Sequence, residues 1–131
     1  MTGDTARRIL IVEDNELNLK LLKDLLDYRG YETVTSSFGG PAVELAREHR
    51  PDLILLDIQL PDIPGTEIAH RLKSDPQTRH IPIFAVTAFA MRGDRAKVLE
   101  SGCDEYIAKP IQIADLFEHI ARYLGEPEPM T

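Results

Sequence analysis

The chain has 131 residues, of which 43% are hydrophobic, so it can build one ordinary core but has no room for a second domain. Its formal net charge is −7 and its Lys and Arg residues form no cluster, which argues against direct DNA binding. No apolar stretch approaches the roughly 20 residues that a membrane span needs, and the N-terminus lacks the apolar core of a signal peptide. We therefore expect a cytoplasmic protein without membrane insertion.

Along the chain, short apolar segments alternate with segments of helical periodicity. The alternation predicts strands at residues 9–12, 31–35, 53–56, 83–86 and 106–108. It predicts helices at about residues 15–29, 41–49, 66–74, 92–101 and 113–124. These elements define one domain at residues 8–124, preceded by a short extension (1–7) and followed by a tail (125–131) that we expect to be disordered.

The first and fourth helices differ most in the strength of their pattern. In the first helix, Gly30 predicts a left-handed stop. Five leucines at short spacing predict its core-facing side: Leu17, Leu21, Leu22, Leu25 and Leu26. The fourth helix is short and mostly polar and contains Gly93, so it is the better candidate for a mobile element.

Strict alternation of strands and helices predicts an α/β fold with a doubly wound, five-stranded parallel sheet flanked by five helices. The strand order of such a flavodoxin-like sheet is 2-1-3-4-5, with strands numbered along the chain. Sheets of this kind bind their ligands beyond the carboxyl ends of the strands. The side chains that follow each strand are therefore the first place to look for a site.

Polar residues with related chemistry follow four of the predicted strands. Glu13 and Asp14 end the first strand, Asp57 the third, Thr87 the fourth and Lys109 the fifth. In the order 2-1-3-4-5 the three carboxylates crowd together, Thr87 lies one strand from Asp57 (about 4.8 Å) and Lys109 two strands away (roughly 10 Å). An Asp at a strand end is often only a turn or capping residue, but the convergence of all four ends favours a site.

Crowded carboxylates require a positive partner. Oxygen ligands without His or Cys favour a hard cation, and a partly open site favours Mg²⁺, which also bridges phosphate oxygens. Lys109 can then neutralise one phosphoryl oxygen and Thr87 can hydrogen-bond another. Asp57, between these groups, is the best candidate for a nucleophile that forms an acyl phosphate.

The chain resembles the receiver domains of two-component response regulators. The resemblance covers about residues 8–124 and is carried by Ile11-Val12-Glu13-Asp14-Asn15, Leu56-Asp57-Ile58, Val86-Thr87-Ala88 and Lys109-Pro110-Ile111. It implies that Asp57 takes a phosphoryl group from a phosphohistidine on a sensor histidine kinase or a phosphotransfer protein. It also implies that Glu13, Asp14, Asp57 and the backbone carbonyl of Gln59 hold Mg²⁺.

The resemblance further implies a switch. Thr87 would move toward the phosphoryl group and Tyr106 would turn inward, changing the surface of the fourth helix, fifth strand and fifth helix that binds a downstream protein. The Lys109–Pro110 peptide would be cis. The chain is most similar to single-domain members that act in cell-cycle control, and it would be a signalling switch rather than an enzyme, catalysing at most its own phosphorylation and dephosphorylation. Pro64 and Phe89 depart from common family usage and leave the lifetime of the phosphorylated state open.

Two other functions use similar elements. A magnesium-dependent phosphatase could use Asp57 as its nucleophile, but dehalogenase-like phosphatases usually place a second Asp where this chain has Gln59, and no cap-sized insertion is present. A flavin- or nucleotide-binding module could share the fold. The anionic loop at residues 13–16 would, however, repel phosphate.

Overall fold

A computed structural model describes residues 7–88 and 94–125 of the chain. The expected N-terminal extension and C-terminal tail lie outside these residues, except for Arg7 and Gly125. Phe89 and the beginning of the fourth predicted helix lie outside them as well.

The sheet has the predicted topology. Strands β1 (Arg8–Val12), β2 (Glu32–Ser36), β3 (Leu53–Asp57), β4 (Ile83–Thr87) and β5 (Glu105–Ala108) are all parallel, in the order β2-β1-β3-β4-β5. β2 begins one residue later than predicted. The amide of Tyr31 donates to the carbonyl of Leu26 at 3.0 Å, so this residue belongs to the turn after the first helix.

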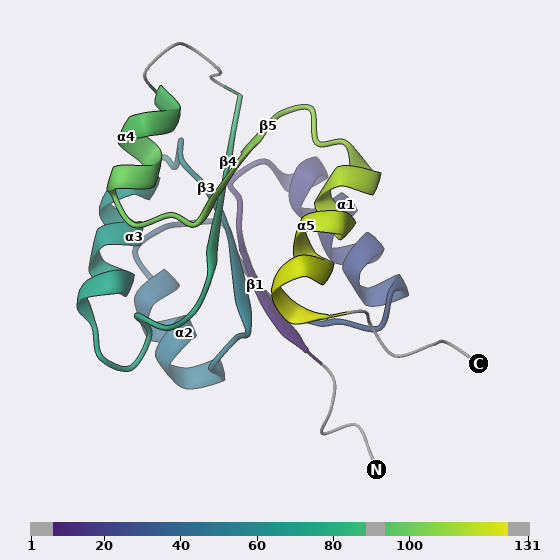
Figure 1. Cartoon of the computed structure of the whole chain (residues 1–131), viewed down its shortest axis with the longest axis horizontal. Helices are drawn as coiled ribbons and strands as arrows, with labels where there is room; N and C mark the ends of the chain where they lie inside the picture. Colours follow the sequence, from purple (N-terminus) through teal and green to yellow (C-terminus); the bar gives the residue numbers. More distant parts are fainter. Residues whose placement is uncertain (1–6, 89–93, 126–131) are drawn as a thin grey trace.

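Within the described residues, five helices cover the two faces of the sheet. α1 (Glu16–Tyr28) and α5 (Ile113–Leu124) lie on one face, and α2 (Ala42–His49), α3 (Gly65–Ser74) and α4 (Asp94–Glu100) lie on the other (Figure 1). β3 and β4 are buried along their whole length, as central strands of a doubly wound sheet should be. Among the described helices, none is both long and apolar enough to cross a membrane.

The prediction for the core-facing side of α1 was wrong in part. Leu22 and Leu26 are buried as expected, but the side chains of Leu17 and Leu21 are 79% and 53% exposed. Leu21 and Leu22 point about 100° apart on the helix, and only Leu22 faces the sheet. The exposed leucines leave an apolar strip on the outer side of α1.

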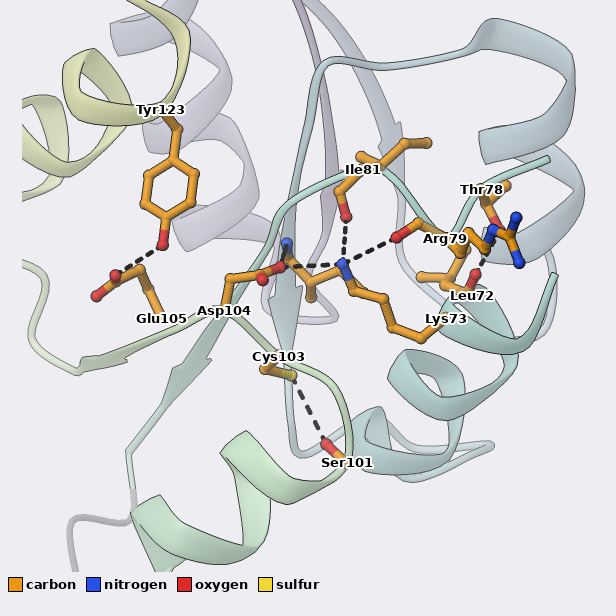
Figure 2. A network of polar contacts seen from close by, with 11 residues as sticks. Leu72, Lys73, Thr78, Arg79, Ile81, Ser101, Cys103, Asp104, Glu105 and Tyr123 are labelled. Carbon is orange, nitrogen blue, oxygen red and sulfur yellow. Dashed lines mark hydrogen bonds and ion pairs between the residues drawn. The ribbon is translucent and has the colours of Figure 1, made fainter. Parts of the chain in front are cut away.

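A polar clasp closes the sheet at the amino ends of β4 and β5 (Figure 2). The ammonium of Lys73, in α3, lies 3.1 Å from a carboxylate oxygen of Asp104 and donates to the carbonyls of Ile81 and Arg79 at 2.9 and 3.2 Å. The same oxygen of Asp104 accepts the amide of Ile83 at 2.8 Å. The clasp ties the last turn of α3 to the segments that enter both strands.

Candidate functional site

The sheet brings the three acidic residues together at the carboxyl ends of the strands. Val12 pairs with Leu56 in the register of β1 and β3, so the residues that follow, Glu13 and Asp57, emerge side by side. One carboxylate oxygen each from Glu13, Asp14 and Asp57 lies within 4.8 Å of the others. Glu13 and Asp57 are only 2% and 3% exposed, whereas Asp14 is exposed.

Lys109 reaches across the sheet to this cluster. Its ammonium lies 2.9 Å from a carboxylate oxygen of Glu13 and 3.3 Å from one of Asp57. Burial opposes the charged form of Lys109, but the hydrogen bonds and charges of the two carboxylates outweigh burial and raise its pKa. One ammonium thus serves two buried carboxylates.

The charge at Asp57 remains incompletely balanced. Burial, followed by the proximity of Glu13, raises the pKa of the Asp57 carboxyl, although the Gln59 amide and Lys109 act in the opposite direction. A carboxylate that is hard to keep ionised in the apo protein has room for a further positive charge. The cluster is therefore a candidate cation-binding site.

Local backbone geometry orients both buried carboxylates. The amide of Asn15 donates to Glu13 at 3.1 Å, and the amide of Gln59 donates to Asp57 at 3.0 Å. Gly65, at the start of α3, packs directly under β3: a Cβ atom there would come within 2.5 Å of the Asp57 carbonyl oxygen. A glycine is required because only its backbone can approach so closely.

Thr87 ends β4, the strand next to that of Asp57, and Tyr106 lies in β5, one strand further along the sheet. Asp57 pairs with Val86, so the buried Thr87 stands one residue further along β4. Tyr106 is half-buried and packs against the core layer shared with α2, α3 and α4. The Lys109–Pro110 peptide is cis.

The donor set fits a hard divalent cation. Three carboxylate oxygens that lie this close together can share one ion, and the absence of His and Cys from the three-residue cluster favours Mg²⁺ over Zn²⁺. The site is open on the side of the exposed Asp14, which leaves access for a phosphoryl oxygen.

Sequence reasoning missed an apolar groove beside the site. It has a volume of about 430 Å³ and is lined by residues of α1, the residue after β4, the segment after β5 and the start of α5. These residues are Asn18, Leu21, Leu22, Ala88, Lys109, Pro110, Ile111 and Ile113. The exposed leucines of α1 continue this apolar surface. A signal was present in the number of leucines in α1, which is more than one buried stripe can hold: Leu17, Leu19, Leu21, Leu22, Leu25 and Leu26.

Comparisons with known proteins agree with this geometry. The family model for the response regulator receiver domain matches residues 9–121. The chain is 53% identical to the polar-differentiation response regulator DivK of Brucella anthropi over 120 residues, which covers 92% of this chain and 98% of that protein.

Two solved structures are informative about sites and partners. The first is the receiver domain of the sensor histidine kinase PA1611 from Pseudomonas aeruginosa, with a magnesium ion in its active-site cleft (TM-score 0.85, 35% identity, 92% of this chain and 98% of that chain). The second is the receiver domain of Ssk1 from Saccharomyces cerevisiae, solved with the histidine phosphotransfer protein Ypd1 (TM-score 0.83, 29% identity, 90% and 88%). The fold, the family match and these relatives together show that the chain belongs to the response regulator receiver domain family.

Proposed function

We propose that Asp57 accepts a phosphoryl group from a phosphohistidine of a sensor histidine kinase or a phosphotransfer protein. The observation that carries the proposal is the position of Asp57: a buried carboxylate beside Glu13 and Asp14, with Lys109 3.3 Å away. A carboxylate oxygen of Asp57 forms the new bond to phosphorus while the bond to the imidazole nitrogen breaks. The imidazole leaves with the electron pair of that bond.

Glu13, Asp14, Asp57 and the backbone carbonyl of Gln59 would hold Mg²⁺ at this edge of the sheet. The ion, when bound, neutralises charge that builds up on the phosphoryl oxygens. The magnesium-bound receiver domain of PA1611 supports this assignment by similarity. Lys109 would neutralise a second phosphoryl oxygen.

The same proposal makes Thr87 and Tyr106 the elements that report phosphorylation. Thr87 is near enough along β4 to hydrogen-bond the new phosphoryl group on the neighbouring strand. Its movement would let the half-buried Tyr106 turn inward and change the surface formed by α4, β5 and α5, which would bind a downstream protein. From the similarity to the polar-differentiation response regulator DivK, we propose that the protein acts in cell-cycle control, in the cytoplasm.

The apolar groove supports a protein as the phosphoryl donor. Leu21 lines it together with Lys109, and the neighbouring Leu17 is 79% exposed, so a partner helix could cover these side chains while its histidine approaches Asp57. The Ypd1–Ssk1 complex shows that a receiver domain of this fold binds a phosphotransfer protein.

The central test uses a small phosphodonor. Acetyl phosphate and Mg²⁺ should add one phosphoryl group to the wild type, as measured by intact-protein mass. Asp57→Asn should remain unlabelled, while the exposed control Asp24→Asn should label normally. Undiminished labelling of Asp57→Asn would refute the phosphoacceptor assignment, and continuous turnover of a small phosphate ester would favour the phosphatase alternative.

A second test separates the protein donor from the small one. Leu21→Ser should slow phosphorylation by a phosphorylated kinase or phosphotransfer protein by about tenfold, the effect of losing one apolar anchor worth about 1.4 kcal/mol. Labelling by acetyl phosphate should not change, because that donor needs no apolar surface. Equal slowing with both donors would contradict a docking role for the groove.

A further inference from the structure

Asp62 joins two loops that are far apart in the sequence. One carboxylate oxygen accepts the amide of Gly39 at 2.9 Å, and the other accepts the amide of Gly40 at 2.8 Å. These two hydrogen bonds are the leading causes that lower the pKa of the Asp62 carboxyl. Both oxygens of one exposed side chain are thus engaged by the backbone of the loop between β2 and α2.

The loop that carries Asp62 is the one that leaves the phosphorylation site. It spans residues 58–64, begins next to Asp57 and contains Gln59, whose carbonyl is a proposed metal ligand. The two ends of this loop are held together, because the amide of Gly65 donates to the carbonyl of Ile58 at 2.9 Å. Between these ends, Asp62 provides a link to another part of the molecule.

Packing supports the same connection between the two loops. Gly39 is buried, and a Cβ atom at its position would lie 3.0 Å from a methyl carbon of Leu60. The glycine therefore lets the loop of residues 58–64 lie close against its neighbour. The carboxylate of Asp62 and the side chain of Leu60 hold one loop against the other from two positions.

We propose that Asp62 is a positioning residue for the cation site. By anchoring residues 58–64 to Gly39 and Gly40, it holds the Gln59 backbone in place, so the loop does not have to be ordered when the cation binds. This inference rests on the proposed magnesium site and adds a residue that would control its affinity. Through the same hydrogen bonds, binding of the cation would reduce the opening of the loop between β2 and α2.

The choice of aspartate follows from the hydrogen bonding. A carboxylate accepts both amides and gives charge-assisted bonds, whereas an asparagine side chain has only one acceptor oxygen. Asp62→Asn should therefore keep part of the anchor, and Asp62→Ala should lose all of it. The two variants form a graded series at one exposed position.

The first measurement is the dissociation constant for Mg²⁺, by calorimetry on the unphosphorylated protein. We expect Asp62→Ala to weaken binding by about tenfold, the lower end of the range for residues that orient metal ligands, and Asp62→Asn to weaken it less. Asp75→Ala is a matched control. Asp75 also accepts a backbone amide in a surface loop and is paired with Arg47, but it follows α3, and its described side-chain hydrogen bonds and ion pairs do not involve residues 58–64.

The second measurement is hydrogen exchange at the amides of Gly39 and Gly40. Coupling between two sites is reciprocal, so Mg²⁺ should slow exchange at both amides in the wild type by about the factor that Asp62 contributes to its binding. In Asp62→Ala this effect of Mg²⁺ should disappear. If Asp62 only stabilised the two loops, the exchange rates of these amides in the wild type would be the same with and without Mg²⁺.

Activity provides a third readout with the same logic. Phosphorylation of Asp62→Ala by acetyl phosphate should need about tenfold more Mg²⁺ for half-maximal rate but should reach the wild-type rate at saturation. Equal Mg²⁺ affinity of wild type and Asp62→Ala would overturn the proposed role of Asp62 but not the proposed metal site. Failure of the wild type to bind Mg²⁺ would instead overturn the proposed metal site.

Discussion

The two ends of the sheet each hold a partly buried lysine, and the lysines are in opposite situations. At the carboxyl ends of the strands, Lys109 faces the buried carboxylates of Glu13 and Asp57. At the amino ends, Lys73 faces one carboxylate, Asp104, and two backbone carbonyls (Figure 2). At the first end, the carboxylates outnumber the lysine, and we call it the unmatched end. At the second end, Lys73 and Asp104 carry one charge of each sign, and we call it the matched end.

The difference separates function from stability. Matched groups in a partly buried network hold elements together and leave no capacity for a ligand. An excess of buried carboxylates is unfavourable in the isolated protein but becomes favourable once a cation binds. We therefore expect substitutions at the two ends to affect different properties.

The largest expected effect is on phosphorylation, at the unmatched end. Lys109→Met should slow labelling of Asp57 by acetyl phosphate by about 100-fold, because an aligned cation that stabilises transition-state charge is lost. Its fold should be retained, as judged by circular dichroism. In this variant Mg²⁺ should raise the unfolding temperature more than in the wild type, since Glu13 and Asp57 then depend on the ion. If Lys109→Met were labelled as fast as the wild type, Lys109 would have no role in phosphorylation.

The next effect is on stability, at the matched end. Lys73→Met should lower the free energy of unfolding by about 2 kcal/mol, because two carbonyls and one carboxylate lose a charged donor. Urea denaturation measures this, and labelling of Asp57 should remain normal. Lys20→Met is the control: its ammonium also pairs with an aspartate, Asp24, but it is on the surface of α1, so the urea midpoint should stay close to that of the wild type. Equal midpoints for the two lysine variants would contradict a stabilising clasp.

A smaller effect on stability should appear at the unmatched end, with the opposite sign. The pKa of Asp57 is raised in the folded state, so its contribution to stability is present at low pH and is lost as pH rises through the folded pKa. Asp57→Asn should consequently be more stable than the wild type at pH 7 without metal, by about 1 to 2 kcal/mol of uncompensated repulsion. The advantage should shrink as pH falls through the raised pKa of Asp57 and should be gone below the usual pKa of an aspartate. Added Mg²⁺ should also reduce it. Thermal unfolding of both proteins across pH measures this difference. A wild type that is more stable than Asp57→Asn at pH 7 without metal would contradict the prediction.

The smallest expected effect is on stability and concerns the hydrogen bond between Tyr123 and Glu105, near the matched end. Tyr123 donates to Glu105 at 2.8 Å, and its ring packs edge-on against Phe84 with centroids 5.0 Å apart. Tyr123→Phe keeps the ring contact and should cost only about 0.5 to 1 kcal/mol. Burial, together with Glu105, raises the pKa of Tyr123 to about 12, so this contribution should persist up to pH 10 and fade as pH rises toward 12. Spectrophotometric titration that gives an unshifted phenol would show that the contact is absent in solution.

The sequence by itself determined the fold class and the identity of the polar cluster. Strand-length apolar runs ending in Glu13, Asp57, Thr87 and Lys109 suffice, because parallel strands of one sheet present their carboxyl ends at the same edge. Gly30 likewise marked the end of α1, where its φ of 91° follows from the turn. These signals are local, so they can be recognised without knowing the packing.

Only the tertiary structure decided how the charges are matched and which loops are joined. Spacing within α1 could not show that Leu17 and Leu21 face outward, because the width of the buried stripe depends on the neighbouring elements. Lys73 meets Asp104, and Asp62 meets Gly39 and Gly40, across long stretches of chain that share no pattern. Such contacts depend on the three-dimensional path of the backbone, which a one-dimensional periodicity does not encode.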